Sequence, residues 1–398
     1  MQIDERIFRE TYDVIVVGGG PAGCLAAYYA AVNGAKTIVF ERDPVIGVPV
    51  RCGEGVSERG IKEYVSMTGP WIVNKVSDVE FVAPDGEKIL IKTDMVSYIL
   101  DRTKFDKHLS EKAEHAGAVI VTETDVTGLF RKHDTPAGVT VQYRGKEYKV
   151  SGKVIIGADG VESRVGRWAG INTVTKLRNM ESSIQVVVSD YTFEPSKIIL
   201  YFSRQVAPGG YAWVFPKNSE KANVGLGIAG TYAHERSAEE YLDQFLKAHF
   251  PGAVYTQKTA GGVPCNPPLK NMVRDNVLLA GDAGHTVNSM SGAGIANALQ
   301  SGQFAGEAAA KACADMKNFN SILQSYPKTW FRGRGRDLKK FDRLKNYVQN
   351  LDDDQLNELT RLLHNIPQSE WSILKIFMFA LRNKPDLILD AIKLYRNF

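Results

Sequence analysis

A glycine-rich segment near the start of the chain carries the clearest chemical signal. Residues 18–23 read GGGPAG; small helix-forming residues follow them, and then a strand-like run from Thr37 that ends at Glu41. Gly18 and Gly20 permit a tight turn and a close backbone approach to a pyrophosphate, Gly23 permits close packing of a helix on a strand, and Glu41 can accept a hydrogen bond from a ribose hydroxyl. Strand-like runs flank the motif on both sides, so the sequence predicts a dinucleotide-binding site.

A second segment has the same glycine spacing in a different setting. Residues 225–230 read GLGIAG, but they lie inside a predicted strand, and residues 231–236 show no clear continuation into a helix and an acidic strand end. The motif needs that context to bind a nucleotide. We therefore interpret this segment as structural, and we expect one nucleotide site of this kind and no separate NADPH domain.

The composition is that of an ordinary soluble globular protein of two to three domains. The chain has 398 residues, of which 44% are hydrophobic and 24% charged, and a net charge of +4 that does not indicate nucleic-acid binding. Its four cysteines form no CxxC pair and favour a reducing compartment, and no spacing typical of metal ligands is present. The first ten residues are polar, and the longest apolar stretch, Ile373 to Leu381, is short and contains Lys375. We expect a cytoplasmic protein, or one that lies on a membrane without crossing it.

Hydrophobic periodicity predicts the elements that position these residues. A helix is expected from Arg102 to Gly117 with Thr103 as its N-cap, and strands are expected at 119–121, 154–156 and 277–280, with a hairpin over 139–148. Residues after Asn297 read as helical. Between 182 and 230 the pattern alternates with a period of two, which predicts an inserted antiparallel sheet. Its candidate strands are 184–188, 198–202, 211–215 and 223–228.

Two further motifs indicate the cofactor. Residues 157–164 (GADGVESR) resemble the DG motif, and residues 276–285 (NVLLAGDAGH) resemble the GD motif, of para-hydroxybenzoate hydroxylase-like flavoproteins. The resemblance implies FAD, with Asp282 at the ribityl or ribose region and Gly292 and Gly294 opening a helix whose N-terminus faces the flavin pyrimidine ring. That placement is physically sensible, because reduced flavin carries negative charge that a positive helix end stabilises.

A third pair of motifs narrows the family. Residues 208–216 (PGGYAWVFP) are similar to the PxxYxWxFP pattern of the geranylgeranyl reductase family, and residues 50–55 (VRCGEG) resemble the cysteine-bearing loop of its archaeal branch, the digeranylgeranylglycerophospholipid reductases. The resemblance covers residues 12 to about 300. It implies an enzyme in which reduced flavin transfers hydride to isoprenoid double bonds, saturating the geranylgeranyl chains of archaeal ether-lipid precursors.

The resemblance also suggests catalytic and substrate-binding residues, which are Cys52, Tyr211 and Trp213, with Phe215 as a further substrate contact. Tyr211 and Trp213 fall on one face of a predicted strand, where they can form a flat apolar wall for an alkene; the alternative is that they are ordinary core aromatics. The family places the loop that carries Cys52 close to the flavin ring. Its thiol could donate a proton, shield the flavin or pair with another cysteine, or it could be buried and inert.

The resemblance implies a Rossmann-like α/β FAD-binding domain with an inserted antiparallel β-sheet substrate domain and a C-terminal helical region. The expected boundaries are 1–75, 99–175 and 265–320 for the FAD-binding domain, 76–98 and 176–264 for the substrate domain, and 321–398 for the helical region. The expected cofactor-binding residues are Gly18, Gly20, Ala22, Gly23, Glu41, Arg42, Arg51, Cys52, Gly53, Arg102, Val126, Asp159, Asp282, Gly292, Gly294 and Ile295.

Other functions remain open at this level. A flavin monooxygenase shares the three FAD motifs, a flavin halogenase shares a tryptophan-rich strand but needs tryptophan in place of Tyr211, and a lipid carrier could hold FAD without turnover. The external electron donor could be ferredoxin, NADPH or a deazaflavin. The basic residues 332–340 and the apolar, partly basic segment 371–398 could rest on an anionic membrane or form an ordinary helical cap.

Overall fold

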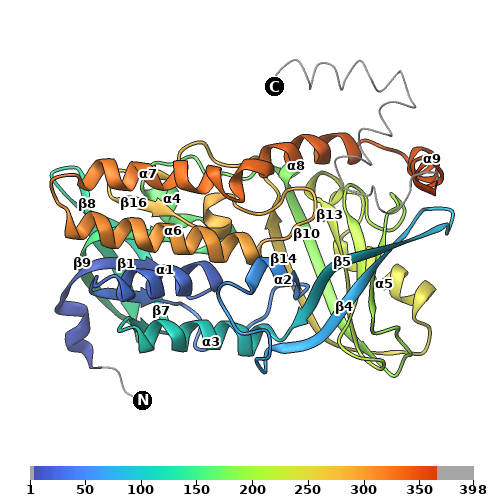
Figure 1. Cartoon of the computed structure of the whole chain (residues 1–398), viewed down its shortest axis with the longest axis horizontal. Coiled ribbons are helices and arrows are strands. Elements are labelled where there is room, and N and C mark those ends of the chain that lie inside the picture. Colours follow the sequence, from blue (N-terminus) through green and yellow to red (C-terminus); the bar gives the residue numbers. More distant parts are fainter. Residues whose placement is uncertain (1–3, 365–398) are drawn as a thin grey trace. The chain divides into compact units, whose positions relative to one another are not determined.

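The computed structural model describes residues 4–364 and divides the chain into two compact units (Figure 1). Of the described residues, unit 1 comprises 4–72, 100–179 and 263–339, and unit 2 comprises 73–99, 180–262 and 340–364. Each unit is assembled from segments that are separated in the sequence, as we expected for the FAD-binding and substrate domains. The C-terminal region that we expected to form a separate domain from residue 321 is instead divided between the two units at residue 339. The domain boundaries themselves stay a prediction.

Unit 1 is built on a parallel sheet in the order β16-β9-β1-β2-β6, with the short β15 at its edge. The β1 strand pairs in parallel with both β2 and β9, so it lies at the centre. Its apolar run is buried on both faces, which is the pattern of a parallel strand covered on each side. The strands are β1 (Thr11–Val17), β2 (Thr37–Phe40), β6 (Val119–Val121), β9 (Lys146–Gly157), β15 (Val273–Arg274) and β16 (Val277–Leu279).

Helices cover one face of this sheet and an antiparallel extension covers the other. Val14 and Val16 pack with the helices α1, α6 and α7, whereas Ile15 and Val17 pack with the strands β7 and β8, as the alternation of side chains along a strand requires. The remaining elements of unit 1 are η1 (Glu5–Arg9), α1 (Pro21–Val32), β3 (Gly55–Ser57), α2 (Glu58–Ile61), α3 (Arg102–His115), β7 (Thr124–Lys132), β8 (Thr135–Tyr143), η2 (Gly160–Glu162), α4 (Arg164–Trp168), η3 (Leu177–Asn179), η5 (Gly281–Gly284), α6 (Ile295–Ala314) and α7 (Phe319–Arg332).

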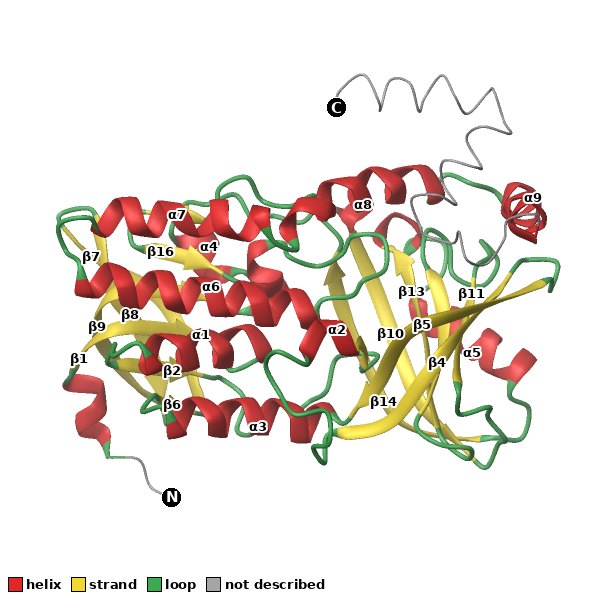
Figure 2. Cartoon of the chain, in the orientation of Figure 1, coloured by secondary structure: helices red, strands yellow, loops and turns green. Residues whose placement is uncertain are grey.

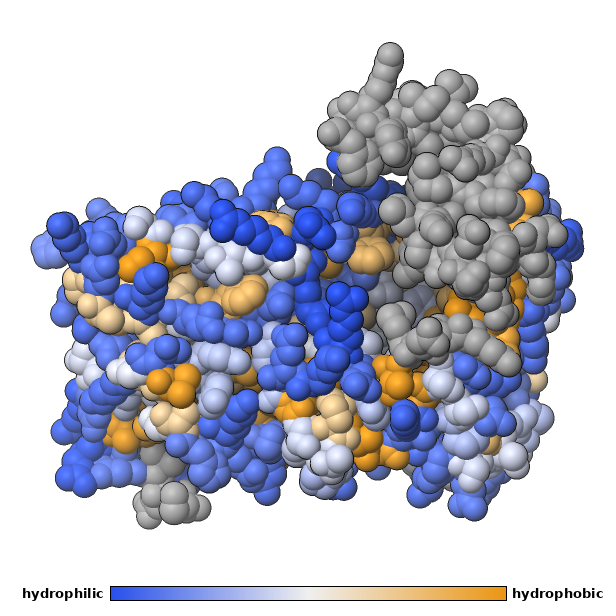
Figure 3. All heavy atoms as spheres, viewed as in Figure 1, coloured by the Kyte–Doolittle hydropathy of each residue, from blue (hydrophilic) through white to orange (hydrophobic). Residues whose placement is uncertain are grey.

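The helices α1 and α6 lie side by side because glycines allow it (Figure 2). A Cβ atom at Gly302 would lie 2.2 Å from the carbonyl oxygen of Ala22, and one at Gly306 would lie 2.3 Å from that of Ala26. Larger side chains on α6 would therefore push the two helices apart. On the viewed face, the helices of unit 1 carry mostly hydrophilic side chains with hydrophobic ones scattered among them (Figure 3).

Unit 2 contains a sheet in the order β14-β10-β13-β12-β11-β4-β5. The predicted strands at 184–188, 198–202, 211–215 and 223–228 correspond to β10, β11, β12 and β13, and β10, β13, β12 and β11 pair antiparallel in turn. The elements are β4 (Ile72–Val82), β5 (Lys88–Leu100), β10 (Met180–Ser189), β11 (Lys197–Tyr201), β12 (Tyr211–Pro216), β13 (Ala222–Ala229), η4 (Gly230–Tyr232), α5 (Ala238–His249) and β14 (Val254–Pro264).

One face of this second sheet forms a core with α5. Ala212 and Val214 on β12 pack there with Leu242 and Phe245 of the helix. The α5 helix begins at a capping box in which Ser237 and Glu240 each accept a hydrogen bond from the other's backbone N–H. Because Ala212 and Val214 face α5, the residues that alternate with them lie on the opposite face of the sheet.

The predicted helical character after Asn297 is confirmed over the described residues by α6, α7, α8 (Gly335–Val348) and α9 (Asp353–His364). Within unit 2, the backbone N–H of Arg204 donates to Asp353 (2.7 Å), which attaches the start of α9 to the loop after β11. The segment 371–398, for which we considered a membrane-resting role, lies outside the described residues.

The prediction of Thr103 as a helix N-cap is wrong. The α3 helix begins at Arg102, and the side chain of Asp101 accepts hydrogen bonds from the backbone N–H groups of Thr103 and Lys104. Aspartate is a better N-cap than threonine, and the Thr103 hydroxyl itself donates to Asp101 (2.5 Å).

Candidate functional site

The predicted nucleotide-binding residues meet at the carboxyl edge of the parallel sheet. Gly18 follows β1, Glu41 follows β2, and Asp159 comes shortly after β9. Carboxyl ends of parallel strands are where such sheets bind ligands. A cavity of about 280 Å³ opens there. Of the predicted cofactor-binding residues, those that line it are Gly18, Gly20, Glu41, Arg42, Arg51, Arg102, Val126 and Asp159.

The glycines of the first loop have different roles. Gly18 has φ of +104°, and a Cβ there would lie 2.3 Å from the carbonyl oxygen of Ala158. A Cβ at Gly23 would lie 1.9 Å from the carbonyl oxygen of Gly18, so both positions are needed for the loop to fold. At Gly20, by contrast, a Cβ would meet no atom within 4 Å. The open space beside Gly20, at the N-terminus of α1, has the character of a phosphate site.

Glu41 is already held by the glycine loop. Its Oε2 accepts a hydrogen bond from the N–H of Gly19 (2.6 Å), and its Oε1 accepts one from the N–H of Asp43 (2.9 Å). A carboxylate has about four acceptor positions, so two bonds leave capacity for a ribose hydroxyl. The backbone bonds fix the orientation in which Glu41 would receive it.

The arginines of the cavity differ in whether they have an acidic partner. Arg42 pairs with Glu162 and Arg164 pairs with Asp125, both at 2.9 Å. Arg51 also lines the cavity, and among the residues that the structure describes it forms no ion pair. Arg51 is therefore the cavity cation best able to meet a pyrophosphate.

Arg102 connects the cavity to the cysteine loop. Its Nε and Nη2 atoms both donate to the carboxylate of Asp106 at 2.7 Å, and its guanidinium also hydrogen-bonds with the thiol of Cys52. Burial disfavours the charge of Arg102, but Asp106 and Cys52 outweigh it and raise the pKa of the guanidinium. The backbone N–H of Glu54 donates to the Cys52 sulfur (3.2 Å), and the Glu54 carboxylate accepts from the N–H of Arg102 (3.0 Å). These bonds tie the predicted loop of Cys52 and Gly53 to the start of α3.

Two aspartates of unit 1, Asp159 and Asp282, have partly buried side chains. Asp159 Oδ2 accepts from the N–H of Val165 (2.9 Å), whereas its Oδ1 is buried and has no hydrogen-bond partner within the described part of the chain. Burial raises the pKa of Asp159, and burial also raises the pKa of Asp282, with Arg102 opposing it. A Cβ at Gly294 would lie 3.3 Å from Asp282 Oδ1, so Asp282 is beside the residue that precedes α6.

The N-terminus of α6 has the features that the resemblance implied. Gly294 is the N-cap and provides no side-chain hydrogen bond, and Ile295 begins the helix. Gly292 has φ of +67°, in the region that glycine tolerates best. A 20-residue helix with an uncapped start presents free N–H groups to an acceptor.

These observations test whether FAD fits the chain. An unpaired carboxylate oxygen on Asp159, the open space at Gly20, the unpaired charge of Arg51 and the uncapped start of α6 match hydroxyl, pyrophosphate and ring-oxygen groups. The residues fit the cofactor. Ala22 and Gly23, which we also predicted as cofactor-binding residues, lie in the first turn of α1 and do not line the cavity.

We expect Asp159→Asn to stabilise the FAD-free protein at pH 7 and to weaken FAD binding. The amide still accepts from Val165 but removes a buried charge, so the free energy of unfolding should rise by about 1 kcal/mol. Burial raises the pKa of Asp159 in the folded protein above 3.8. Below pH 3.8 the carboxyl is protonated in both the folded and the unfolded wild-type protein, so it does not destabilise the fold. As the pH rises from 3.8 through the raised pKa, ionisation of Asp159 lowers the free energy of unfolding of the wild type. The gain should therefore vanish below about pH 4.

Urea unfolding of the FAD-free protein at several pH values measures this effect, and flavin titration measures affinity, which should fall by about tenfold or more. The exposed Asp243→Asn provides a control with no expected change in either quantity. A variant less stable than wild type at pH 7 would show that Asp159 is held in a favourable charged state.

In unit 2, the predicted substrate-contacting aromatics form a row along β12. The ring centroids of Tyr211 and Trp213 are 6.0 Å apart, and those of Trp213 and Phe215 are 6.1 Å apart. Phe202 extends the row, 5.8 Å from Tyr211. All lie on the sheet face opposite α5. Trp213 is 9% exposed, and its indole Nε1 is buried without a hydrogen-bond partner in the described residues.

The second GxGxxG segment has a structural role that explains its glycines. Gly225 pairs with Trp213 across β12 and β13, and a Cβ on Gly225 would lie 2.6 Å from the Trp213 ring. The indole can therefore lie over β13 only because residue 225 has no side chain. This supports the interpretation of residues 225–230 as a strand segment and not a phosphate loop.

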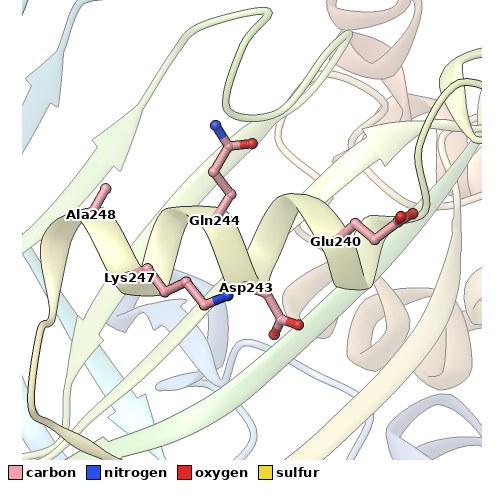
Figure 4. A pocket seen from close by; sticks show the side chains of 5 residues that line it. All are labelled: Glu240, Asp243, Gln244, Lys247 and Ala248. Carbon is pink, nitrogen blue, oxygen red and sulfur yellow. The ribbon is translucent and has the colours of Figure 1, made fainter.

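Other features of the described chain do not extend the site. A hollow on the outward side of α5 is lined by Glu240, Asp243, Gln244, Lys247 and Ala248, a mixture of charges with no predicted role (Figure 4). Within the described residues, no three His, Cys, Asp or Glu side chains gather as metal ligands would. All four cysteines are free thiols. In residues 4–364 we find no helix of the length and apolar character required to span a bilayer.

Several residues that line the cavity were not predicted from the sequence, chiefly Thr124, Asp125, Glu162, Arg164 and Trp168. Thr124 and Asp125 follow β6, so their place after a parallel strand was a usable signal. Arg164 lay inside the quoted DG motif without an assigned role. The pairing of Arg164 with Asp125 joins residues far apart in the sequence, and no local pattern indicates it.

Known proteins resemble both parts of the chain. A family model described as geranylgeranyl reductase catalytic domain matches residues 179–263, and one described as FAD dependent oxidoreductase matches residues 13–193. Digeranylgeranylglycerophospholipid reductase 1 of Methanococcoides burtonii is 37% identical over 362 residues, which is 90% of this chain and 89% of that protein.

Solved structures of flavoproteins have a fold similar to that of this chain. The crystal structure of a geranylgeranyl bacteriochlorophyll reductase-like protein from Thermoplasma acidophilum has a TM-score of 0.91 and 31% identity, covering 97% of this chain and 99% of that one. A flavin-dependent brominase, at 18% identity and a TM-score of 0.66 over 98% of this chain and all of its own, shares the fold alone.

Proposed function

Because the chain belongs to the geranylgeranyl reductase family of FAD-dependent oxidoreductases, we propose that it saturates the isoprenoid double bonds of digeranylgeranyl glycerophospholipids, the archaeal ether-lipid precursors. The observation that carries the proposal is the 37% identity, over 90% of this chain, to a reductase named for that lipid. Halogenase and monooxygenase activities are disfavoured, because the likeness to a flavin-dependent brominase (18% identity) and to a probable FAD-dependent monooxygenase (19% identity) is far weaker in sequence.

We assign two tasks in the reaction to different residues of the chain: delivery of a proton and contact with the substrate. When bound in its reduced form, FAD supplies hydride to one alkene carbon. We assign delivery of the proton to the other carbon to the Cys52 thiol, since the N–H of Glu54 donates to its sulfur and stabilises the thiolate left behind. The row of Tyr211, Trp213 and Phe215 provides an apolar surface suited to a prenyl chain.

The proposed partners are the lipid and an external electron donor. The one recognised nucleotide loop is occupied by the proposed FAD site, so reducing equivalents must come from outside: a ferredoxin, NADPH or a deazaflavin. Anaerobic reduction of the bound flavin by each of these in turn identifies the donor. Exposed basic side chains on Arg332, Arg336 and Lys339 support presentation of the lipid at an anionic membrane surface.

The test of the function uses the whole FAD-loaded protein. Chemically reduced protein is mixed without oxygen with digeranylgeranyl phospholipid in anionic vesicles, and we expect the flavin to reoxidise while the lipid gains hydrogen at its double bonds. Absorbance follows the flavin and mass spectrometry follows the lipid. A monooxygenase would need oxygen and add an oxygen atom. Flavin that stays reduced beside unchanged lipid would refute the proposed reaction and leave a lipid carrier.

Trp213→Ala should leave FAD bound and lower kcat/KM for long prenyl lipids by roughly tenfold to a hundredfold, the loss expected for one large apolar contact. FAD should remain because Trp213 does not line the cavity of unit 1. Trp213→Phe keeps an aromatic ring and should recover most of the activity. Equal turnover by the alanine variant and wild type would mean that the aromatic row is only part of the sheet core.

A further inference from the structure

We propose that residues 172–178 of unit 1 form a membrane-binding loop, in which Val174 and Leu177 enter the apolar layer of an anionic lipid surface and Lys176 and Arg178 contact its phosphate headgroups. The inference rests on the proposed function in one respect, because a protein that reduces a membrane lipid has to reach that lipid. The basic side chains between 332 and 339 would attract the protein to such a surface. The 172–178 loop would be the segment that enters it.

The loop exposes two large apolar side chains close together in the sequence. Leu177 is 70% exposed and Val174 is 65% exposed, the highest values among the large apolar side chains that the structure describes. A single exposed apolar side chain is ordinary on a protein surface, and Met316, which is 60% exposed just after α6, is an example. Two of them on one short loop can enter the same lipid layer together.

Hydrogen bonds to the rest of unit 1 hold the loop in the conformation that exposes these side chains. The Thr173 hydroxyl donates to the carbonyl oxygen of Ser163 (3.2 Å), and the side-chain amide of Asn266 donates to the Thr175 hydroxyl (2.6 Å). Thr173 is only 2% exposed. Because both threonines are fastened to unit 1, Val174 between them projects outward, and its exposure is a fixed property of the loop.

Basic side chains flank the second apolar residue. Lys176 and Arg178 are both exposed on either side of Leu177, and the N–H of Asn179 donates to the carbonyl oxygen of Lys176 (2.8 Å), which closes the turn. Neither cation forms an ion pair within the described part of the chain, and residues 172–180 contain no Asp or Glu. Positive charge beside exposed apolar side chains complements an anionic membrane surface.

A lipid surface fits the loop better than a protein partner does. A specific protein interface takes about 20–30 residues from each partner and has a packed apolar core. The loop offers seven residues, of which two are large and apolar. A lipid layer requires no matching shape, and a few inserted side chains together with basic neighbours are enough to bind it.

The experiment measures binding of the FAD-loaded protein to vesicles of phosphatidylglycerol and phosphatidylcholine, by co-sedimentation at low and at high salt. The double variant Val174→Ser, Leu177→Ser should lower the partition coefficient by about tenfold or more. The double variant Lys176→Gln, Arg178→Gln should lower it by about tenfold at low salt and weaken its salt dependence. Wild type should bind more weakly to vesicles of phosphatidylcholine alone.

Met316→Ser is the matched control, because Met316 is nearly as exposed but follows an acidic residue, Asp315. Its binding should equal that of wild type, and an equal loss in this variant would refute a specific role for the loop. Unchanged binding by the Val174→Ser, Leu177→Ser variant would overturn the proposal. So would a dimer in solution that this variant separates while vesicle binding stays the same, because the loop would then join two copies. Thermal unfolding of each variant should match wild type, since every altered side chain is exposed.

Leu177→Trp tests insertion directly. Lipids with brominated acyl chains quench a tryptophan that enters the apolar layer, so this variant should lose more emission than wild type on such vesicles, and Met316→Trp should not. No added quenching would overturn the insertion of the loop. Neither measurement requires turnover, so a protein that inserts but never saturates lipid would keep the loop assignment and lose the reductase function. Saturation of detergent-dispersed lipid by a protein that binds no vesicles would do the reverse.

Discussion

Replacement of Cys52 by alanine is expected to lower the rate of lipid saturation by about 100-fold to 10,000-fold, the range typical of a lost general acid, while FAD stays bound. The cofactor should stay because Cys52 is not among the residues that line the dinucleotide cavity. Single-turnover reoxidation of the reduced flavin by lipid, without oxygen, measures the chemical step. The amount of bound flavin is measured on the same samples.

The matched control is Cys313→Ala on α6, which removes a thiol that donates weakly to the backbone of Asp13 and is expected to leave turnover unchanged. Cys52→Ser keeps a donor of similar size but with a much less acidic proton, so it should resemble the alanine variant. Wild-type rates in both Cys52 variants would assign proton delivery to another group and leave Cys52 a structural role.

The second large effect concerns the glycine loop. Gly23→Ala should yield protein that takes up no FAD, because the added Cβ would lie 1.9 Å from the carbonyl oxygen of Gly18 and 3.0 Å from its carbonyl carbon. These are backbone atoms and cannot swing away as a side chain would. We expect colourless protein, with a loss in the free energy of unfolding of roughly 1–3 kcal/mol or more.

Gly20→Ala is the control that separates loop folding from cofactor contact. Its Cβ would meet nothing within 4 Å, so stability without FAD should equal that of wild type. If the open space is where the pyrophosphate approaches the backbone, affinity for FAD should still fall. Normal FAD uptake by Gly23→Ala would contradict the role that we give to the loop, and normal affinity in Gly20→Ala would move the phosphate elsewhere.

The sequence was sufficient to predict features that depend on local pattern. The loop at Gly18, the buried strands and the alternating residues of β12 follow from spacing and hydrophobic period, and the structure contains each of them. The predicted N-cap failed because Asp101 and Thr103 are both good capping residues two positions apart, and spacing does not choose between them. The known preference for aspartate over threonine at the N-cap was the usable signal.

The ion pair between Arg102 and Asp106 could have been predicted, because it has the i, i+4 spacing of a helical ion pair. Other features depend on contacts between residues far apart in the sequence, which no local pattern indicates. The contact of Arg102 with Cys52 joins a loop to a helix through the fold, and so does the ring of Trp213 over Gly225. Gly225 forms part of a GxGxxG pattern, but the residue that requires a glycine there is Trp213 on the neighbouring strand β12. The local sequence around Gly225 does not show this.

The packing of α6 against α1 has a consequence for how the protein is made. Ala22 and Ala26, near the start of the chain, find their partners Gly302 and Gly306 only after residues 180–262 of the other unit have been synthesised. During synthesis on the ribosome, the apolar side of α1 therefore cannot pack against α6 until most of the polypeptide has emerged. Such widely separated partners slow folding, since a long loop has to close before the contact forms. Unit 1 thus begins to emerge from the ribosome before unit 2, yet unit 1 cannot finish folding until residues 180–262 of unit 2 have been synthesised.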